Sequence, residues 1–135
     1  MPNVAAPLLA DLQRYGVELS PTPFSIKELA RSARVFLHHG GTGCCHLGLV
    51  AGVPQIAIVS DMEKAVNGRA LTMLGAGRTI DYSRLTLPSL RQQTDEIFGD
   101  DNLHRHAADL GGTMRARLTG PDPIDIAAER ILAAA

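Results

Sequence analysis

The sequence predicts an α/β fold in which short parallel strands alternate with helices. Two apolar runs with the composition of buried strands, Val35–Leu37 and Gln55–Val59, are separated by a stretch whose apolar residues have helical spacing. A third run, Arg78–Ile80, follows a further helical stretch at Ala65–Leu74. Alternation of this kind produces βαβ units, whose strands lie parallel in a single sheet with helices packed against it.

The composition is that of one ordinary globular domain. The chain has 135 residues, of which 45% are apolar and 20% are charged, and its formal net charge is -1. This length suffices for one core but not for two domains with a cleft between them. The charge balance lacks the basic excess of nucleic-acid-binding proteins, so we expect no nucleic acid partner. No apolar run reaches the roughly 20 residues of a membrane span, and the N-terminus lacks the order of a signal peptide, which predicts a cytoplasmic protein.

A capping box marks the start of a helix before the first predicted strand. Ser25 and Glu28 have the spacing in which each side chain bonds the backbone N–H of the other residue, and the helix is expected to end near Ala33. Upstream, the pattern predicts a helix, a short strand and an extended proline-containing linker, at Leu8–Tyr15, Val17–Leu19 and Ser20–Pro23.

Helices also fill the C-terminal third of the chain. Thr86 before Pro88, and Asp122 before Pro123, place a capping residue ahead of an early-helix proline. Helical spacing predicts a further helix at Asn102–Leu110. We therefore expect no second domain in this region.

Several side chains outside the glycine-rich segment have plain structural interpretations. We expect Met62 and Met73 to pack in the core, because methionine fills irregular gaps there. The polar and charged side chains of the C-terminal helices are expected to be solvated on the surface, namely His104, His106, Arg115 and Arg117.

The first strand runs directly into a glycine-rich turn, His39-Gly40-Gly41-Thr42-Gly43. Glycine permits backbone conformations closed to other residues and leaves room for a group to approach the backbone. A helix that begins here offers unpaired N–H groups and the positive end of its dipole to an anion. The carboxyl edge of a parallel sheet is also where α/β proteins usually bind ligands. We therefore expect an anion site, with His39 donating a hydrogen bond to a phosphate oxygen.

The residues alone leave three other interpretations of this segment open. The glycines could serve only to pack a tight turn, since the turn matches neither the dinucleotide fingerprint nor the phosphate loop of nucleotide hydrolases. A cysteine at the helix N-terminus could be a nucleophile. A zinc site is a third alternative, although the ligand spacing is unlike that of structural zinc sites, and we expect neither a metal nor a cofactor. The side chains that could ligate zinc are His38, His39, Cys44, Cys45 and His46.

The wider stretch Ala33–Gly77 carries a more specific pattern. An apolar strand ends in His-His-Gly-Gly, a helix ends in Gly-Val-Pro, and a second strand is followed by an acidic residue and then an asparagine. In this order the chain resembles the donor-binding half of the UDP-glycosyltransferase-like family. The resemblance implies a three-layer, Rossmann-like parallel sheet with flanking helices, the incomplete C-terminal half of a GT-B fold. It makes residues 1–135 a single partial donor-binding domain.

The resemblance also implies where a nucleotide sugar would lie. The diphosphate of a UDP or TDP sugar is expected against the turn, and the sugar hydroxyls are expected near the start of the next helix, where the family has an acidic-plus-amide pair and an asparagine. The diphosphate contacts would be His39, Gly40, Gly41, Thr42, Gly43 and Cys44, and the sugar contacts would be Glu63, Lys64 and Asn67.

Two positions depart from the family pattern. Leu47 stands where many members place a glutamate on the ribose hydroxyls, and leucine cannot form that hydrogen bond. Cys44 stands where a serine or threonine hydroxyl commonly helps to bind phosphate, and a thiol is a poorer donor. Members with deoxysugar donors also vary at the ribose position, so the resemblance admits a thymidine nucleotide as well as a uridine nucleotide.

The family reaction needs more than this chain is expected to hold. Its members transfer a hexosyl group to an acceptor hydroxyl, and the acceptor and catalytic base belong to an N-terminal domain that we expect this chain to lack. We therefore expect no catalytic residue here, no activity of the chain alone and an acceptor that the sequence does not identify. An unpaired sheet edge beside the Val35 strand is expected, which a second copy or a missing-domain partner could cover. A non-catalytic or decayed fragment is the alternative.

Overall fold

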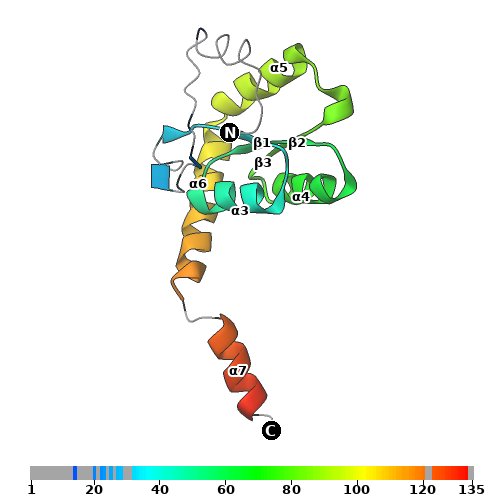
Figure 1. Ribbon diagram of the computed structural model, residues 1–135. Coiled ribbons are helices and arrows are strands. Elements are labelled where there is room, and N and C mark those ends of the chain that lie inside the picture. Colours follow the sequence, from blue (N-terminus) through cyan, green and yellow to red (C-terminus); the bar gives the residue numbers. More distant parts are fainter. Residues whose placement is uncertain are drawn as a thin grey trace.

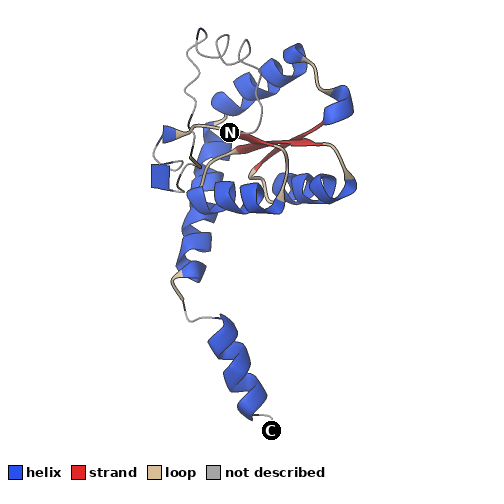
Figure 2. Ribbon diagram, viewed as in Figure 1, coloured by secondary structure: helices blue, strands red, loops and turns tan. Residues whose placement is uncertain are grey.

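The chain is organised around a three-stranded parallel sheet with helices on both faces (Figure 1, Figure 2). The computed structural model describes residues 14, 20, 22, 23, 25, 27, 28, 32–120 and 123–133. In chain order the elements are β1 (Phe36–His38), α3 (Thr42–Ala51), β2 (Gln55–Val59), α4 (Met62–Met73), β3 (Gly77–Asp81), the 3-10 turn η1 (Tyr82–Arg84), α5 (Leu87–Phe98), α6 (Asp101–Leu118) and α7 (Pro123–Ala133). The strand order β1, β2, β3 follows the chain. The predicted three-layer α/β fold is confirmed.

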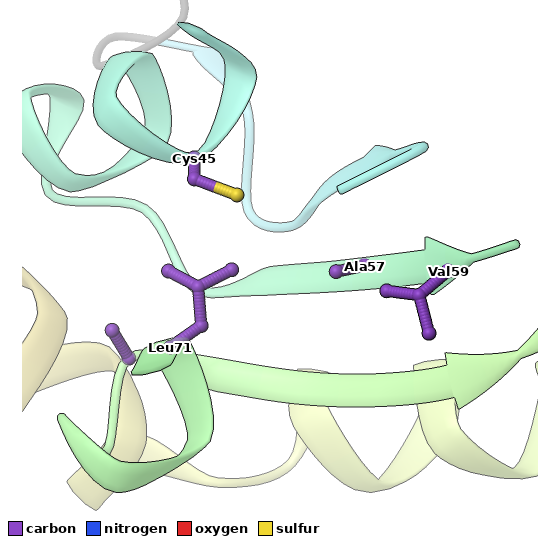
Figure 3. Packing of buried hydrophobic residues seen from close by; sticks show 5 residues of the cluster. Cys45, Ala57, Val59 and Leu71 are labelled. Carbon is purple, nitrogen blue, oxygen red and sulfur yellow. The ribbon is translucent and has the colours of Figure 1, made fainter. Parts of the chain in front are cut away.

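Helices α3 and α4 cover one face of the sheet. Ala57 and Val59, alternate residues of β2, face these helices. Cys45 of α3 and Leu71 of α4 pack against them (Figure 3). Because β2 is covered on both faces, its sequence is almost continuously apolar and lacks the alternation of a half-exposed strand.

Helix α5 and the start of α6 cover the opposite face. Ile56 of β2, Ile80 of β3 and Ile97 of α5 form the core on this side. Helix α5 begins at the predicted cap, where the Thr86 hydroxyl accepts from the Ser89 N–H and the Ser89 hydroxyl accepts from the Thr86 N–H. This reciprocal capping box fixes where the helix starts after the 3-10 turn.

Helix α6 crosses the C-terminal end of α3 at very short range. A Cβ added to Gly111 would lie 2.5 Å from the Gly52 Cα, and one added to Gly52 would lie 3.2 Å from the Ala108 Cα. Gly52 also has a φ of 74°, the left-handed conformation that ends many helices. Arg115 of α6 donates a hydrogen bond to the Val50 carbonyl in the last turn of α3. The close approach thus depends on glycine in both chain segments.

Two histidines in the N-terminal half of α6 form hydrogen bonds with carbonyl groups at the ends of α5 and α4. His104 Nε2 lies 3.0 Å from the Ile97 carbonyl oxygen of α5, and His106 Nε2 lies 2.8 Å from the Leu74 carbonyl oxygen at the end of α4. The expectation that these histidines and Arg115 are only solvated surface groups is therefore wrong. The last carbonyls of a helix have no partner within the helix, and basic side chains satisfy them.

Met62 and Met73 lie outside the core, contrary to the expectation from sequence. Their exposed fractions are 81% and 78%. Helix α4 begins three residues before its predicted start, because the Asp61 side chain caps it by accepting from the Lys64 N–H. The helix turns Leu71 toward the sheet and leaves both methionines in solvent at its two ends.

The N-terminal segment contains the predicted capping box. The Ser25 N–H donates to Glu28 Oε2 at 2.8 Å, and the Glu28 N–H donates to Ser25 Oγ at 3.2 Å. The elements predicted at Leu8–Tyr15 and Val17–Leu19 lie outside the described residues, apart from one helical position in the first, and so does the predicted cap Asp122. In the part of the chain that the structure describes, no helix has the length and apolar character needed to span a membrane.

Two adjacent glycines of α6 test its contact with α3. Gly111→Ala should lower the free energy of unfolding by about 1–3 kcal/mol, because the added methyl group would overlap the Gly52 backbone. Gly112→Ala should raise it by about 0.5–1 kcal/mol, because nothing lies within 4 Å of the added Cβ and alanine favours the helix. Urea unfolding measures both values, and equal effects of the two substitutions would contradict the packing.

Candidate functional site

Glycine holds the turn between β1 and α3 in one conformation. Gly40 has a φ of 79°, in the left-handed region that other residues avoid, and a Cβ there would lie 3.0 Å from Val59 Cγ1. Gly41 is the N-cap of α3. A Cβ on Gly41 would lie 2.6 Å from Nε2 of His39, so the exposed His39 ring lies against this glycine. Any side chain at either position would displace its neighbours.

A buried imidazole anchors the turn from the sheet side. His38, the last residue of β1, is 8% exposed, and its Nδ1 accepts a hydrogen bond from the Gly40 N–H at 3.0 Å. Nδ1 is therefore unprotonated, and Nε2 donates to Gln55 Oε1 at 2.9 Å. Burial lowers the pKa of His38 below its ordinary value, against the opposing effect of the Gln55 hydrogen bond. His38 is thus a neutral bridge from the strand to the turn.

Gln55 extends this bridge into helix α3. Its Nε2 donates to the Cys45 carbonyl at 3.3 Å, and the residue has no exposed surface. A Cβ on Gly48 would lie 2.3 Å from Gln55 Cδ, so the helix can approach the amide only because residue 48 is glycine. Among the described residues, no buried side-chain nitrogen or oxygen lacks a partner. A buried polar chain that is fully bonded in this way makes the local structure rigid.

The first turn of α3 presents unpaired N–H groups to the outside. The helix has no side-chain cap and no acidic residue in its first turn. Its first backbone bond runs from the Cys45 N–H to the Gly41 carbonyl. Before it, the N–H groups without an acceptor in the described part of the chain are those of Gly41, Thr42, Gly43 and Cys44. Together with the positive end of the helix dipole, these donors form an open site for an anion.

Asn67 of α4 holds the turn from the other side. Its Nδ2 lies 3.0 Å from the Gly40 carbonyl oxygen and 3.2 Å from Thr42 Oγ1. The carboxamide therefore faces the turn itself. The structure brings the predicted Asn67 to the predicted glycine segment, although the two are far apart in the sequence.

The other two residues predicted to contact sugar lie at the start of α4. The Cβ of Lys64 would be 3.2 Å from a Cβ on Gly40, so the base of this side chain adjoins the turn. Its ammonium group forms an ion pair with Asp61, and this hydrogen-bonded pairing lowers the pKa of the Asp61 carboxyl below its usual value. Glu63 is exposed beside them. The polar side chains at the carboxyl end of β2 thus lie next to the open helix end.

The geometry does not support the zinc hypothesis or a nucleophilic Cys45. Both ring nitrogens of His38 are bonded within the protein. Burial raises the pKa of the Cys45 thiol, whereas a cysteine nucleophile needs a lowered pKa. Over the described ranges, no three His, Cys, Asp or Glu side chains come close enough together to hold a metal ion.

The comparison with known proteins extends well beyond the turn. Residues 21–133 match the family described as erythromycin biosynthesis protein CIII-like, C-terminal domain. The chain belongs to this family. The glycosyltransferase resemblance, and the expected identity as the C-terminal domain of a GT-B fold, are thereby confirmed.

Relatives of this C-terminal domain are considerably longer proteins. NDP-glycosyltransferase YjiC of Bacillus licheniformis is 29% identical over 96 residues, which are 66% of this chain and 24% of that protein. Tylactone mycaminosyltransferase of Streptomyces fradiae is 31% identical over 83 residues, which are 62% of this chain and 18% of that protein. The chain thus spans less than a third of the length of these relatives.

Solved glycosyltransferase structures share the arrangement. The Streptomyces sp. SF2575 glycosyltransferase SsfS6, complexed with thymidine diphosphate, matches 83% of this chain and 28% of its own with a TM-score of 0.60 and 28% identity. The glycosyltransferase SnogD from Streptomyces nogalater matches 83% of this chain and 29% of its own with a TM-score of 0.58 and 27% identity.

Sequence reasoning missed the two buried polar residues beneath the turn. From the sequence, His38 is only a candidate zinc ligand, and Gln55 is only part of an apolar strand. The one signal for Gln55 was a polar residue at the start of an otherwise apolar run. Their contact depends on the register in which Phe36 pairs with Gln55 and His38 with Ala57, and a single sequence does not contain that register.

The lowered pKa of His38 predicts a pH-dependent stability. Between the folded pKa and the unfolded value of about 6.5, only the unfolded chain binds a proton at this residue, so the free energy of unfolding should fall as the pH drops through that window. Above about pH 6.5 this contribution is fully present. His38→Asn should reduce the fall, whereas His46→Asn, at an exposed site on α3, should leave it in place. Urea unfolding between about pH 8 and 5 measures this, and identical slopes in wild type and His38→Asn would exclude the assignment.

Proposed function

We propose that residues 1–135 are the partial donor-binding domain of a glycosyltransferase, which binds the diphosphate of a nucleotide sugar at the N-terminus of α3. The observation that carries the proposal is the uncapped first turn of α3, whose N–H groups face outward without a partner in the described part of the chain. The turn is already fixed by His38 and Asn67, so no rearrangement is needed before an anion can bind. Family membership supports a donor site over any other anion site.

The proposed contacts divide between the turn and α4. The backbone N–H groups from Gly41 to Cys44 receive the phosphate oxygens, and the exposed His39 ring donates a further hydrogen bond to the diphosphate. This arrangement would stabilise the charge on the leaving diphosphate. Glu63 and Lys64, beside the turn, are the proposed contacts of the sugar hydroxyls.

Leu47 favours a thymidine nucleotide over a uridine nucleotide. Its side chain packs against the cluster of Ala51 and Val53, so it belongs to the hydrophobic core and offers no hydrogen bond to ribose. A uridine nucleotide would place its 2′-hydroxyl without a carboxylate partner, whereas the deoxyribose of TDP has no such group to satisfy. The complex of SsfS6 with thymidine diphosphate supports the same choice.

We propose that this chain supplies only the donor side of the reaction. Transfer of a hexosyl group to an acceptor hydroxyl needs a base that activates the acceptor, whereas His39, Glu63 and Lys64 beside the turn are proposed as contacts of the donor. The acceptor site and base are expected in the part of the relatives that this chain does not match. We also propose a cytoplasmic location, and cover for the edge of β1 by that part or by a second copy.

Substitution at Gly43 separates binding from folding. A Cβ at this position meets nothing within 4 Å, so a side chain there is compatible with the fold. Gly43→Asp should raise the free energy of unfolding by about 0.3–1 kcal/mol, because a carboxylate in the first turn interacts favourably with the helix dipole. The same carboxylate should abolish TDP binding, because it occupies the anion site and its negative charge repels the diphosphate.

Calorimetric titration with TDP and UDP measures the effect on binding. Wild type should bind TDP more tightly than UDP, His39→Ala should weaken both, and Gly43→Asn should weaken binding less than Gly43→Asp does. Absence of binding by folded wild type would favour the alternative of a decayed fragment. Binding that survives Gly43→Asp would place the nucleotide elsewhere.

A further inference from the structure

The hydrogen bonds of Asn67 limit what this residue can offer a ligand. A carboxamide has two N–H donors and one acceptor oxygen. The structure directs Nδ2 to the Gly40 carbonyl at 3.0 Å and to Thr42 Oγ1 at 3.2 Å, which uses both donors within the protein. Asn67 therefore has no donor left for a phosphate or a sugar oxygen.

The bond to the Gly40 carbonyl fixes the direction of the next N–H group. The described residues contain no cis peptide bond, so the carbonyl of Gly40 and the N–H of Gly41 point in opposite directions from their shared peptide plane. Because Asn67 holds the carbonyl toward α4, the Gly41 N–H is held away from α4. This N–H is the first of the unpaired donors of the site.

The bond to Thr42 acts on the hydroxyl at the start of α3. The Thr42 oxygen accepts from Asn67 and keeps its own proton free to donate. The hydroxyl thereby becomes an additional donor in the same turn as the open N–H groups. Asn67 of α4 thus orients both a backbone donor, the Gly41 N–H, and a side-chain donor, the Thr42 hydroxyl.

We infer that Asn67 is a positioning residue for the diphosphate turn and donates no hydrogen bond to the sugar or the phosphates. It acts through the Gly40 carbonyl and the Thr42 hydroxyl, and the inference rests on the proposed donor site. A sugar ligand matters only when the sugar is present, whereas a positioning residue matters equally for the diphosphate alone.

Calorimetric titration of the full chain with TDP and with TDP-glucose distinguishes these roles. Asn67→Ala should weaken both ligands by the same factor, about tenfold, because the two hydrogen bonds that aim the donors are lost. Asn102→Ala, an exposed asparagine on α6, is the matched control and should leave both affinities unchanged. A loss confined to TDP-glucose would make Asn67 a sugar ligand and overturn the inference.

A double-mutant cycle tests the route through Thr42. Thr42→Val and Asn67→Ala should each weaken TDP binding. The double variant should lose less than the product of the two single losses, because one substitution removes the Thr42 hydroxyl and the other removes the bond that orients it. Multiplicative losses would overturn this route. Thermal unfolding without nucleotide checks the fold: if Asn67→Ala lowers the affinity for TDP and TDP-glucose alike only through a smaller folded fraction, the residue is merely structural and the inference fails.

Nucleotide binding by wild type distinguishes failure of the Asn67 inference from failure of the proposed donor site on which it rests. Folded wild type that binds neither TDP nor TDP-glucose would overturn the donor site and, with it, the role of Asn67. Wild type that binds both, together with Asn67→Ala that binds both unchanged, would overturn the role of Asn67 alone.

Discussion

The geometry of the site depends on the buried hydrogen bond from the Gly40 N–H to His38 Nδ1. This bond holds the left-handed glycine directly after the strand, and so determines the direction in which α3 departs from the sheet. It requires the tautomer in which Nε2 carries the proton, and Gln55 selects that tautomer by accepting from Nε2. Gln55 in turn fits only because Gly48 leaves room for it. A strand, a turn and a helix are therefore fixed relative to one another by one chain of neutral groups.

The two ends of α3 are treated in opposite ways. At the C-terminal end, Gly52 stops the helix and Arg115 satisfies the Val50 carbonyl. Carbonyls at the ends of α4 and α5 are likewise satisfied by histidines of α6. At the N-terminal end no side chain caps the helix. The closed ends thus gather on α6, whereas the open end of α3 lies at the carboxyl edge of the sheet, where a ligand is expected.

Local signals in the sequence predicted much of this structure. The capping box at Ser25 and the cap at Thr86 could be predicted because each involves residues only a few positions apart. The proposed diphosphate contacts from His39 to Cys44 could be named from sequence because they are contiguous. The exposure of Met62 could not be predicted from sequence, because it depends on which residue caps α4.

Long-range contacts account for most of what the sequence did not reveal. Arg115 and Val50 are 65 positions apart, and an isolated arginine in a polar helix gives no sign of a partner at that distance. The His38 and Gln55 contact needs the strand register, and the role of Asn67 needs the approach of α4 to the turn. In each case the missing information is the placement of one element against another.

Water is the natural partner of the open first turn of α3. Exposed N–H groups without a protein acceptor are hydrated, and a ligand must take the place of those waters. No protein contact has to break first, because the Gly40 conformation is held by groups behind the turn and not by groups in front of it. The backbone entropy of the turn is thus lost when the chain folds, and the exchange of water for phosphate oxygens is left as the main event of the proposed nucleotide binding.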